Sequence, residues 1–386
     1  MKPINSYVKN MPPSGIRKFF DIVSTMKDVV SLGVGEPDFV TPWPMISAAI
    51  DSMEMGKTSY TSNMGLLPLR QEISKYIKTN IGVEYNPDSQ ILITVGVSEA
   101  MDLLMRALIC PGDEIIVFEP SYVSYIPTIE MAGGKSVVLE CREENDFLPD
   151  LEELKSKITP KTKAVLFNFP SNPTGCVLTR EINQKLYDIC QEHDLYIISD
   201  EIYDRLTYDK KHESILEIPG AYKRTILLNG FSKAFAMTGW RIGYACGNCD
   251  IIRSMMKIHQ YTMLCAPISG QYCALEALRH CINLSDEMVE KYRQRRNFIV
   301  KGFNDIGLDC KKPGGAFYVF PSIKKFSMTS EEFCEKLLFE ARVATVPGNA
   351  FGACGEGYIR CSYATSMKNI EKALTETEKF LKNLKR

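Results

Sequence analysis

Short apolar runs alternate with helix-spaced apolar residues along the middle of the chain. The runs are residues 91–95, 114–118, 136–139, 164–169, 196–199 and 225–228. After the first run, Met101, Leu104, Met105 and Leu108 recur at the spacing of one helix face. Strands that alternate with helices predict an α/β fold: a mostly parallel sheet, flanked by helices, whose ligands bind beyond the carboxyl ends of the strands.

The pattern changes in the last third of the chain. A long helical stretch from about residue 268 to the arginines at 293–296 leads into a mixture of expected strands and helices. The expected strands are residues 316–320, 343–346 and 358–362, and the expected helices are residues 331–341 and 369–381. This mixture of strands and helices predicts a smaller α+β domain after the large domain.

We therefore expect three parts. Residues 1–43 form an amino-terminal arm and part of the small domain, residues 44–283 form the large domain, and residues 284–386 form the small carboxyl-terminal domain. Within the arm, residues 16–20 are expected to pack on another part of the protein.

The composition excludes several classes of protein. The 386 residues are 45% hydrophobic and 24% charged, with a formal net charge of -1, so neither nucleic acid nor a membrane is an expected partner. No signal-peptide core or bilayer-spanning run is present in the sequence. Thirteen cysteines without framework spacing indicate reduced thiols in a cytoplasmic protein. Cys246 and Cys249 have no nearby ligand partners, so no metal site is expected.

Residues 228–243 contain the first candidate for chemistry. Lys233 is flanked in sequence by Phe231, Ala234 and Phe235. Apolar surroundings lower the pKa of a lysine and make its neutral amine available to a carbonyl, as Schiff-base chemistry requires. The alternative is an ordinary solvated lysine, so the other motifs are needed to distinguish the two.

Two segments carry groups suited to a phosphate. Residues 96–99 follow a predicted strand and open a helix, so backbone amides and the Ser98 hydroxyl could bind an anion there. A helix cap without a ligand is the alternative. Ser232 and Arg241 add a hydroxyl and a guanidinium.

Other candidates follow other predicted strands. Residues 120–125 offer aromatic faces that either stack on a planar ring or pack on the next helix. The proline-rich string at 168–175 would hold the amide of Asn172 in a set position. Asp200 follows a buried strand, where a carboxylate meets a cation or caps a helix. Arg360 lies in an apolar strand and needs a carboxylate from the protein or from a ligand.

Together these groups match the needs of pyridoxal phosphate. The strings at 168–175, 199–203, 231–243 and 358–362 resemble those of the class I aminotransferases, fold-type I pyridoxal-phosphate enzymes, and especially their aspartate and aromatic aminotransferase branch. The likeness runs from about residue 16 to the end. It implies a large cofactor-binding domain beside the small α+β domain.

The resemblance also implies a role for each candidate. Lys233 would form the aldimine and carry the proton, and Asp200 would keep the pyridine nitrogen protonated. Arg360 and the Gly35 amide would hold the substrate α-carboxylate. Tyr60 would reach the phosphate of a neighbouring subunit, which implies a homodimer with shared sites. The remaining implied residues are Tyr203 and Asn172 at the ring 3-oxygen, Tyr122 stacked on the ring, and Val97, Ser98, Ser232 and Arg241 at the phosphate.

These roles predict ping-pong transamination from an amino acid, such as aspartate or an aromatic one, to a 2-oxo acid, with 2-oxoglutarate expected. Gly230 departs from the serine found there in many relatives, which predicts a weaker grip on the phosphate. Between Arg253 and Arg279, only Lys257 and His259 could supply a cation for a second substrate carboxylate. A pyridoxal-phosphate C–S β-lyase and a non-catalytic binding or regulatory protein of the same fold are the alternatives.

Overall fold

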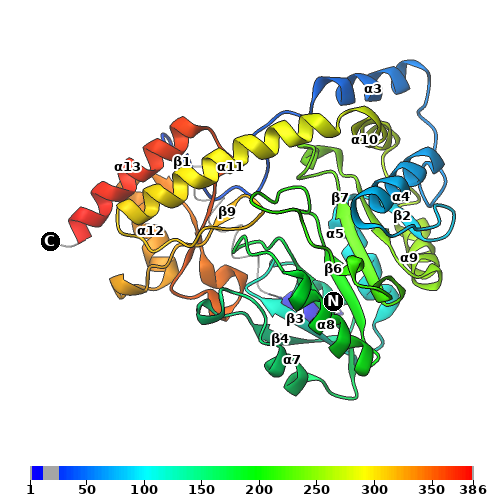
Figure 1. Ribbon diagram of the computed structural model, residues 1–386, viewed down its shortest axis with the longest axis horizontal. Helices are drawn as coiled ribbons and strands as arrows, with labels where there is room; N and C mark the ends of the chain where they lie inside the picture. Colours follow the sequence, from blue (N-terminus) through cyan, green and yellow to red (C-terminus); the bar gives the residue numbers. More distant parts are fainter. Residues whose placement is uncertain (1, 12–25, 385–386) are drawn as a thin grey trace.

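The computed structural model describes residues 2–11 and 26–384. A seven-stranded sheet forms the centre of the larger part (Figure 1). Its strands, in spatial order, are β2 (Ile91–Thr94), β8 (Gly243–Cys246), β7 (Thr225–Gly230), β6 (Tyr196–Asp200), β5 (Thr162–Asn168), β3 (Glu114–Glu119) and β4 (Lys135–Glu140). Only β8 runs antiparallel to its neighbours. The predicted mostly parallel sheet is confirmed.

Helices cover both faces of this sheet, because its strands are apolar on both sides. Successive side chains of a strand point to opposite faces; Ile115 and Val117 of β3 belong to one core cluster and Ile116 to another. One face carries α5 (Gly96–Leu108), α6 (Tyr125–Met131) and α9 (Cys249–Thr262). The other carries α7 (Leu151–Lys157) and α8 (Arg180–Glu192), and a third cluster joins α3 (Trp43–Glu54), α4 (Leu67–Ile81) and α10 (Ile268–His280) to the β2 end.

A second core lies beside the sheet. The long helix α11 (Ile282–Asp305) crosses from the sheet toward the carboxyl-terminal helix, as Figure 1 shows. Around it lie α12 (Ser330–Ala341), α13 (Met367–Leu384) and the antiparallel sheet β11 (Val346–Pro347), β12 (Ile359–Ser362) and β9 (Tyr318–Val319). The strand β1 (Val30–Ser31) pairs in parallel with β10 (Val343–Ala344), so residues near the amino terminus complete this part.

The structure differs from the sequence-based expectations at several elements. The expected continuous helix from 268 to 296 is broken at Cys281, between α10 and α11. The expected strand at 316–320 is only the two residues of β9, and that at 343–346 is divided into β10 and β11. Strand β8 was not expected, because four residues beginning with Gly243 form too short a pattern to recognise.

The connections contain short 3-10 helices. They are η1 (Glu143–Asn145), η2 (Ile215–Glu217), η3 (Ala221–Lys223), η4 (Thr238–Trp240), η5 (Lys324–Phe326), η6 (Gly348–Phe351) and η7 (Ala353–Gly355).

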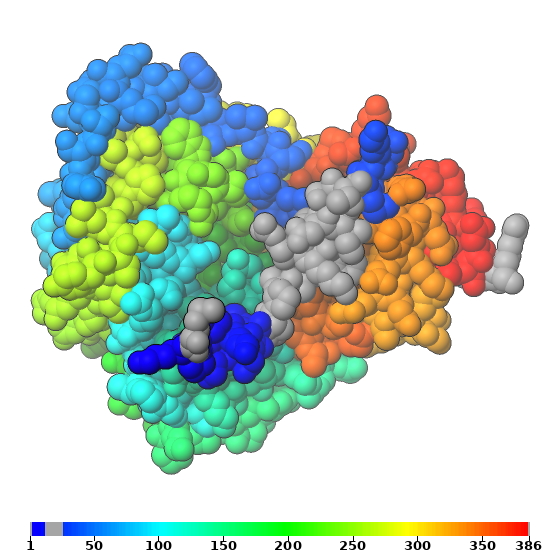
Figure 2. Space-filling model, turned by 180° about the vertical axis from the view of Figure 1, so that it is seen from behind, coloured from blue at the N-terminus to red at the C-terminus, as the bar shows by residue number. Residues whose placement is uncertain are grey.

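The amino-terminal arm is partly described. Helix α1 (Ser6–Asn10) is capped by the Asn5 side chain and lies on the surface of the sheet domain (Figure 2), where the Tyr7 hydroxyl donates to Glu130 Oε2 at 2.6 Å. The expected packing segment at 16–20 lies outside the described residues. The expected domain boundary at 283/284 falls in the first turn of α11. Among residues 2–11 and 26–384, no helix is both long enough and apolar enough to cross a membrane.

Candidate active site

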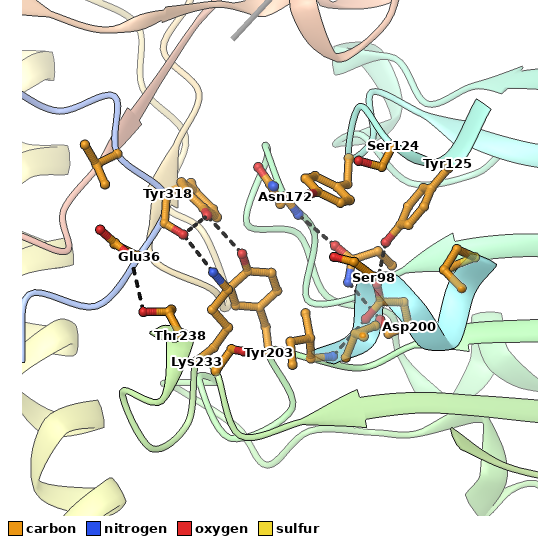
Figure 3. A pocket seen from close by; sticks show the side chains of 18 of the residues that line it. Glu36, Ser98, Ser124, Tyr125, Asn172, Asp200, Tyr203, Lys233, Thr238 and Tyr318 are labelled. Atoms are coloured by element: carbon orange, nitrogen blue, oxygen red, sulfur yellow. Dashed lines mark hydrogen bonds between the residues drawn. The ribbon is translucent and has the colours of Figure 1, made fainter. Parts of the chain in front are cut away.

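One cavity of about 690 Å³ lies at the carboxyl ends of the central strands, where ligands bind in open α/β sheets. Figure 3 shows Lys233 and Tyr203 on one side of it and Asp200 with Tyr125 on the other. All of the sequence-predicted site residues except Tyr60 line this cavity: Gly35, Val97, Ser98, Tyr122, Asn172, Asp200, Tyr203, Ser232, Lys233, Arg241 and Arg360.

Lys233 follows the end of β7 and points into the cavity (Figure 3). Its Nζ donates to the Gly35 carbonyl at 2.8 Å and lies 5.8 Å from the centre of the Phe317 ring. Burial lowers the pKa of Lys233 to about 8; the charge of Glu36 opposes this shift, and that of Arg360 adds to it. An amine with this pKa is partly neutral near physiological pH, so it can act as a nucleophile.

Asp200 is the last residue of β6 and is buried. The Tyr125 hydroxyl donates to its Oδ2 at 2.6 Å, and the Ile202 amide donates to its Oδ1 at 3.1 Å. Burial raises the pKa of Asp200 to about 6, although both hydrogen bonds and the charge of Lys233 act in the opposite direction. A turn follows Asp200, so the alternative of a helix-capping carboxylate is wrong. Asp200 is a buried carboxylate that a cation in the cavity would stabilise.

The neighbouring carboxylate of Glu201 points to a different set of partners. It accepts hydrogen bonds from Ser199 at 2.9 Å and Ser214 at 2.7 Å, and lies 2.8 Å from His212 Nε2. Glu201 is therefore occupied inside the protein and holds the chain that follows β6.

The first turn of α5 and the Arg241 guanidinium together form a place suited to binding an anion. Gly96 has a φ of 72°, and a Cβ at this position would lie 2.6 Å from Arg241 Nη2. The Arg241 guanidinium thus packs directly over the first turn of α5, next to Val97 and Ser98. A guanidinium beside a helix amino terminus is an arrangement that favours phosphate.

Packing explains the glycine at 230. A Cβ there would lie 2.9 Å from Gly243 Cα and 3.0 Å from the Ile242 carbonyl, because β7 and β8 approach each other closely at this point. A serine would not fit without moving one strand, so this departure from the relatives follows from backbone packing.

Arg360 lies in β12, lines the cavity and is only 3% exposed. Its Nη1 donates to Asn172 Oδ1 at 3.0 Å and its Nη2 to the Gly33 carbonyl at 2.6 Å. The guanidinium lies 4.5 Å from the Tyr318 ring centre and 4.7 Å from that of Phe351. No hydrogen-bond partner for Nε exists among the described residues. A buried cation whose partners among the described residues are uncharged oxygens is prepared for a carboxylate from a ligand.

Several residues of the site were missed from the sequence. Tyr318 lines the cavity, and its hydroxyl lies 2.9 Å from that of Tyr203 and 3.4 Å from the Gly35 carbonyl. Tyr125 belongs to the aromatic string that was recognised, but its bond to Asp200 is a tertiary contact. Glu36 also lines the cavity and accepts from the Thr238 hydroxyl at 3.2 Å. Tyr318 lies 115 residues from Tyr203 along the chain, so its place in the site carries no local sequence signal.

Two expectations about outlying residues need separate comment. Tyr60 is 81% exposed and does not line the cavity of its own chain. His259 was considered as a cation for a second substrate carboxylate; this is wrong, because its side chain is 0% exposed and its Nδ1 lies 2.7 Å from Glu99 Oε1. Lys257 is exposed and does not line the cavity either.

Among the described residues, no group of His, Cys, Asp or Glu could hold a metal ion. The cavity instead combines an amine, two carboxylates, two guanidinium groups and several phenols. These donors fit pyridoxal phosphate: Arg241 and the α5 turn suit its phosphate, Asp200 suits its ring nitrogen, and Lys233 suits its aldehyde.

Comparison with known proteins gives a consistent result. The family described as aminotransferase class I and II matches residues 27–376. A putative aminotransferase of Bacillus subtilis is 48% identical, with 98% of each chain covered, and an aspartate aminotransferase of Pyrococcus abyssi is 45% identical, with 97% of each covered. The solved structure of an aromatic aminotransferase from Pyrococcus horikoshii has a TM-score of 0.91 and 42% identity, covering 95% of this chain and 99% of its own.

Proposed function

This chain belongs to the class I and II aminotransferases, and from that premise we propose how its residues perform the reaction. It is a pyridoxal-phosphate-dependent aminotransferase that acts on amino and oxo acids. The fold-type I resemblance is confirmed by full-length structural similarity. The roles of individual side chains and the substrate preference are assigned below.

Bound pyridoxal phosphate supplies an aldehyde that links to amines and a ring that accepts electrons from the substrate α-carbon. Lys233 is the only amine among the described residues that line the cavity, so we assign it both the covalent link and the movement of the α-proton. Its lowered pKa keeps part of the amine neutral and able to accept that proton.

Asp200 and its partner Tyr125 act at the ring nitrogen. Burial makes an unpaired Asp200 carboxylate costly, so a protonated nitrogen next to it would be stabilised by the same carboxylate. The 2.6 Å bond from Tyr125 holds Oδ2 in place. Tyr203 and Asn172 are assigned to the ring 3-oxygen, and Tyr122 to the ring face.

One observation supports an α-amino acid substrate most directly: the buried Arg360 guanidinium lines the same cavity as Lys233, and its hydrogen bonds to described residues reach only uncharged oxygens. A reactive amine and a guanidinium in one cavity suit the reacting amino group and the carboxylate of an amino acid. We also assign the Gly35 amide to the substrate carboxylate, because Gly35 lies beside Arg360: a Cβ on it would be 3.7 Å from Arg360 Nη1.

We assign the phosphate to Val97, Ser98, Ser232 and Arg241, at the first turn of α5. The cavity then has three described cations, Lys233, Arg241 and Arg360, each with a task. A substrate with a second carboxylate, such as aspartate or 2-oxoglutarate, would need a further cation from a partner subunit. We propose 2-oxoglutarate as acceptor and aspartate or an aromatic amino acid as donor, in line with the names of the relatives.

A homodimer with shared sites is part of this proposal. Tyr60 is 81% exposed in an apolar edge that also includes Met53, Met55, Tyr261 and Met263. The two segments of this edge are joined where Asn63 donates to the Leu264 carbonyl at 2.7 Å, and they lie together in Figure 2. Large exposed apolar side chains of this kind mark interfaces. The thirteen cysteines form no disulfide, which supports the cytoplasm as the compartment.

The experiment that tests the function is a screen of amino donors with 2-oxoglutarate, run on the purified protein and on Lys233→Ala. We expect glutamate to form with aspartate or an aromatic donor, and turnover to fall about a thousandfold or more in the variant. The variant should lose the visible absorption band of the lysine-linked cofactor while keeping its circular dichroism spectrum.

Unchanged turnover in Lys233→Ala would contradict the assignment of the lysine. Release of pyruvate and ammonia from cystathionine, without consumption of the oxo acid, would favour the lyase instead.

A further inference from the structure

A buried pair of titratable side chains lies behind the first turn of α5, outside the cavity. His259, in the last turn of α9, is 0% exposed, and its Nδ1 lies 2.7 Å from Glu99 Oε1. The other oxygen of Glu99, Oε2, accepts the backbone amide of Val95 at 2.5 Å. A carboxylate oxygen accepts hydrogen bonds, so this contact is satisfied by the tautomer of His259 that carries a proton on Nδ1. The pair has no part in the reaction proposed above.

Glu99 connects the turn before α5 to the helix itself. Val95 has φ -76° and ψ 68°, and Gly96 has a φ of 72°, so both residues lie outside the helical and extended regions. The bond from the Val95 amide to Glu99, which lies one turn later, closes this bend. The bend sets the course of the backbone at Gly96 and Val97, and Gly96 lies next to Arg241: a Cβ on it would be 2.6 Å from Arg241 Nη2.

His259 secures Glu99 from the opposite side. Helices α5 and α9 share one core cluster, so the imidazole reaches the carboxylate from a rigid neighbour and not from a loop. The second ring nitrogen, Nε2, is buried and has no partner among the described residues. Within residues 2–11 and 26–384, the only polar contact of this side chain is therefore with Glu99, and a leucine would fill the space without the donor.

The same end of α9 also holds the Tyr60 loop. The carbonyl of Leu264, just beyond α9, accepts from Asn63 at 2.7 Å, and Leu264 is itself tied to the His259 carbonyl at 3.0 Å. Two segments that we assign to phosphate binding are thus anchored to the last turn of α9. One is the first turn of α5, which would bind the phosphate of its own chain, and the other is the Tyr60 loop, which would reach the phosphate of a partner chain.

We propose that Glu99 and His259 are positioning residues for the phosphate of the cofactor, acting through the bend at Val95–Val97. This inference rests on the proposed function, which places the phosphate at the first turn of α5. The pair touches no reacting atom; it holds the backbone amides in the orientation that the phosphate requires.

The test compares two aldehydes that differ only in the phosphate. Full-length protein freed of cofactor is titrated with pyridoxal 5'-phosphate and with pyridoxal, and the Kd of each is measured from the absorption band formed with Lys233. In His259→Leu we expect the Kd for pyridoxal 5'-phosphate to rise about tenfold, the factor for one lost hydrogen bond to a charged group. The Kd for pyridoxal should stay within about twofold of the wild type, because the lysine and Asp200 are untouched.

Two further variants keep the test decisive. His259→Asn carries an amide donor near the position of Nδ1, so it should restore most of the affinity for the phosphate form. Glu99→Met removes both hydrogen bonds at similar volume and should show the same selective loss, which covers the case in which His259→Leu fails to fold. A loss that is equal for the two aldehydes, or absent for both, would overturn the inference.

Arg241→Met separates this inference from the proposed function. If Arg241→Met selectively weakens pyridoxal 5'-phosphate and His259→Leu and Glu99→Met do not, only the positioning role is wrong. If Arg241→Met does not discriminate between the two aldehydes, the phosphate is bound elsewhere, and the proposed site fails together with the inference.

Discussion

At the scale of single residues, Tyr318 connects the two ends of the substrate site. Its ring lies under the Arg360 guanidinium at 4.5 Å, and its hydroxyl lies 2.9 Å from that of Tyr203. The space is tight, since a Cβ at Gly35 would lie 2.7 Å from the Tyr318 hydroxyl. The ring and the hydroxyl therefore have separable tasks: the ring orients the carboxylate-binding arginine, and the hydroxyl orients the phenol assigned to the cofactor.

This separation predicts different kinetic effects for two substitutions. Tyr318→Leu removes the ring, so KM for the amino acid should rise about fivefold to thirtyfold, as expected for a buried cation–π contact. Tyr318→Phe keeps the ring and loses one hydrogen bond, so KM should change little while kcat falls about threefold to tenfold. Steady-state kinetics of both variants at saturating cofactor provide the measurement, and equal effects on KM would contradict the division of tasks.

At the scale of elements, the segment after β6 is held by the bond between Glu201 and His212. Burial alone would lower the pKa of His212, but the charge of Glu201 and the hydrogen bond to it outweigh burial, so the pKa is raised from its usual value. A histidine with a raised folded-state pKa stabilises the protein fully below its unfolded pKa, about 6.5, and this stabilisation is lost as pH rises through the folded-state pKa.

The prediction concerns His212→Gln. The free energy of unfolding of this variant should be about 1–2 kcal/mol lower than that of the wild type at pH 6, and this difference should shrink as pH rises toward 9. Urea unfolding at fixed cofactor saturation measures the difference. The exposed His193 offers a matched control, because His193→Gln should have little effect on stability at any pH. If the stability difference between the wild type and His212→Gln grew with pH, the predicted direction of the pH dependence would be wrong.

At the scale of the whole molecule, we propose that a second chain completes the site. Tyr60 is 81% exposed and does not line the cavity of its own chain, and each described cation of that cavity already has a proposed role, so none is left for a second substrate carboxylate. Both observations are accounted for if two chains associate through the apolar edge and exchange side chains across it.

Hybrid dimers test this arrangement. Tyr60→Ala should weaken cofactor binding, and Lys233→Ala should be inactive. When equal amounts of the two variants are unfolded together and refolded, half of the dimers are hybrids with one intact site each, so about a quarter of the wild-type activity should return at limiting cofactor. Sedimentation velocity provides the control. A monomeric wild type, or no recovery from a mixture that forms hybrids, would exclude shared sites.

The fold and much of the candidate site could be predicted from sequence because their signals are local. The alternation of apolar runs and helical periods predicted the parallel sheet, and the residues at strand ends were recognisable by type: Lys233, Asp200, Asn172 and Arg360. Strand ends converge in a parallel sheet, so residue type and strand position together were enough to bring these side chains to one edge.

Tertiary structure alone decided the features that depend on contacts between distant segments. The phenol of Tyr318, the Glu99–His259 pair and the break at Cys281 leave no periodic or compositional trace. In the sequence, Gly230 stands out only because many relatives have a serine there. The structure adds the reason, since Gly243 lies too close to leave room for a side chain. The sequence by itself determined which chemical groups are present and which strands carry them, because both are local properties. Packing decided which partners those groups meet, because burial and hydrogen bonding are set by neighbours far apart in the chain.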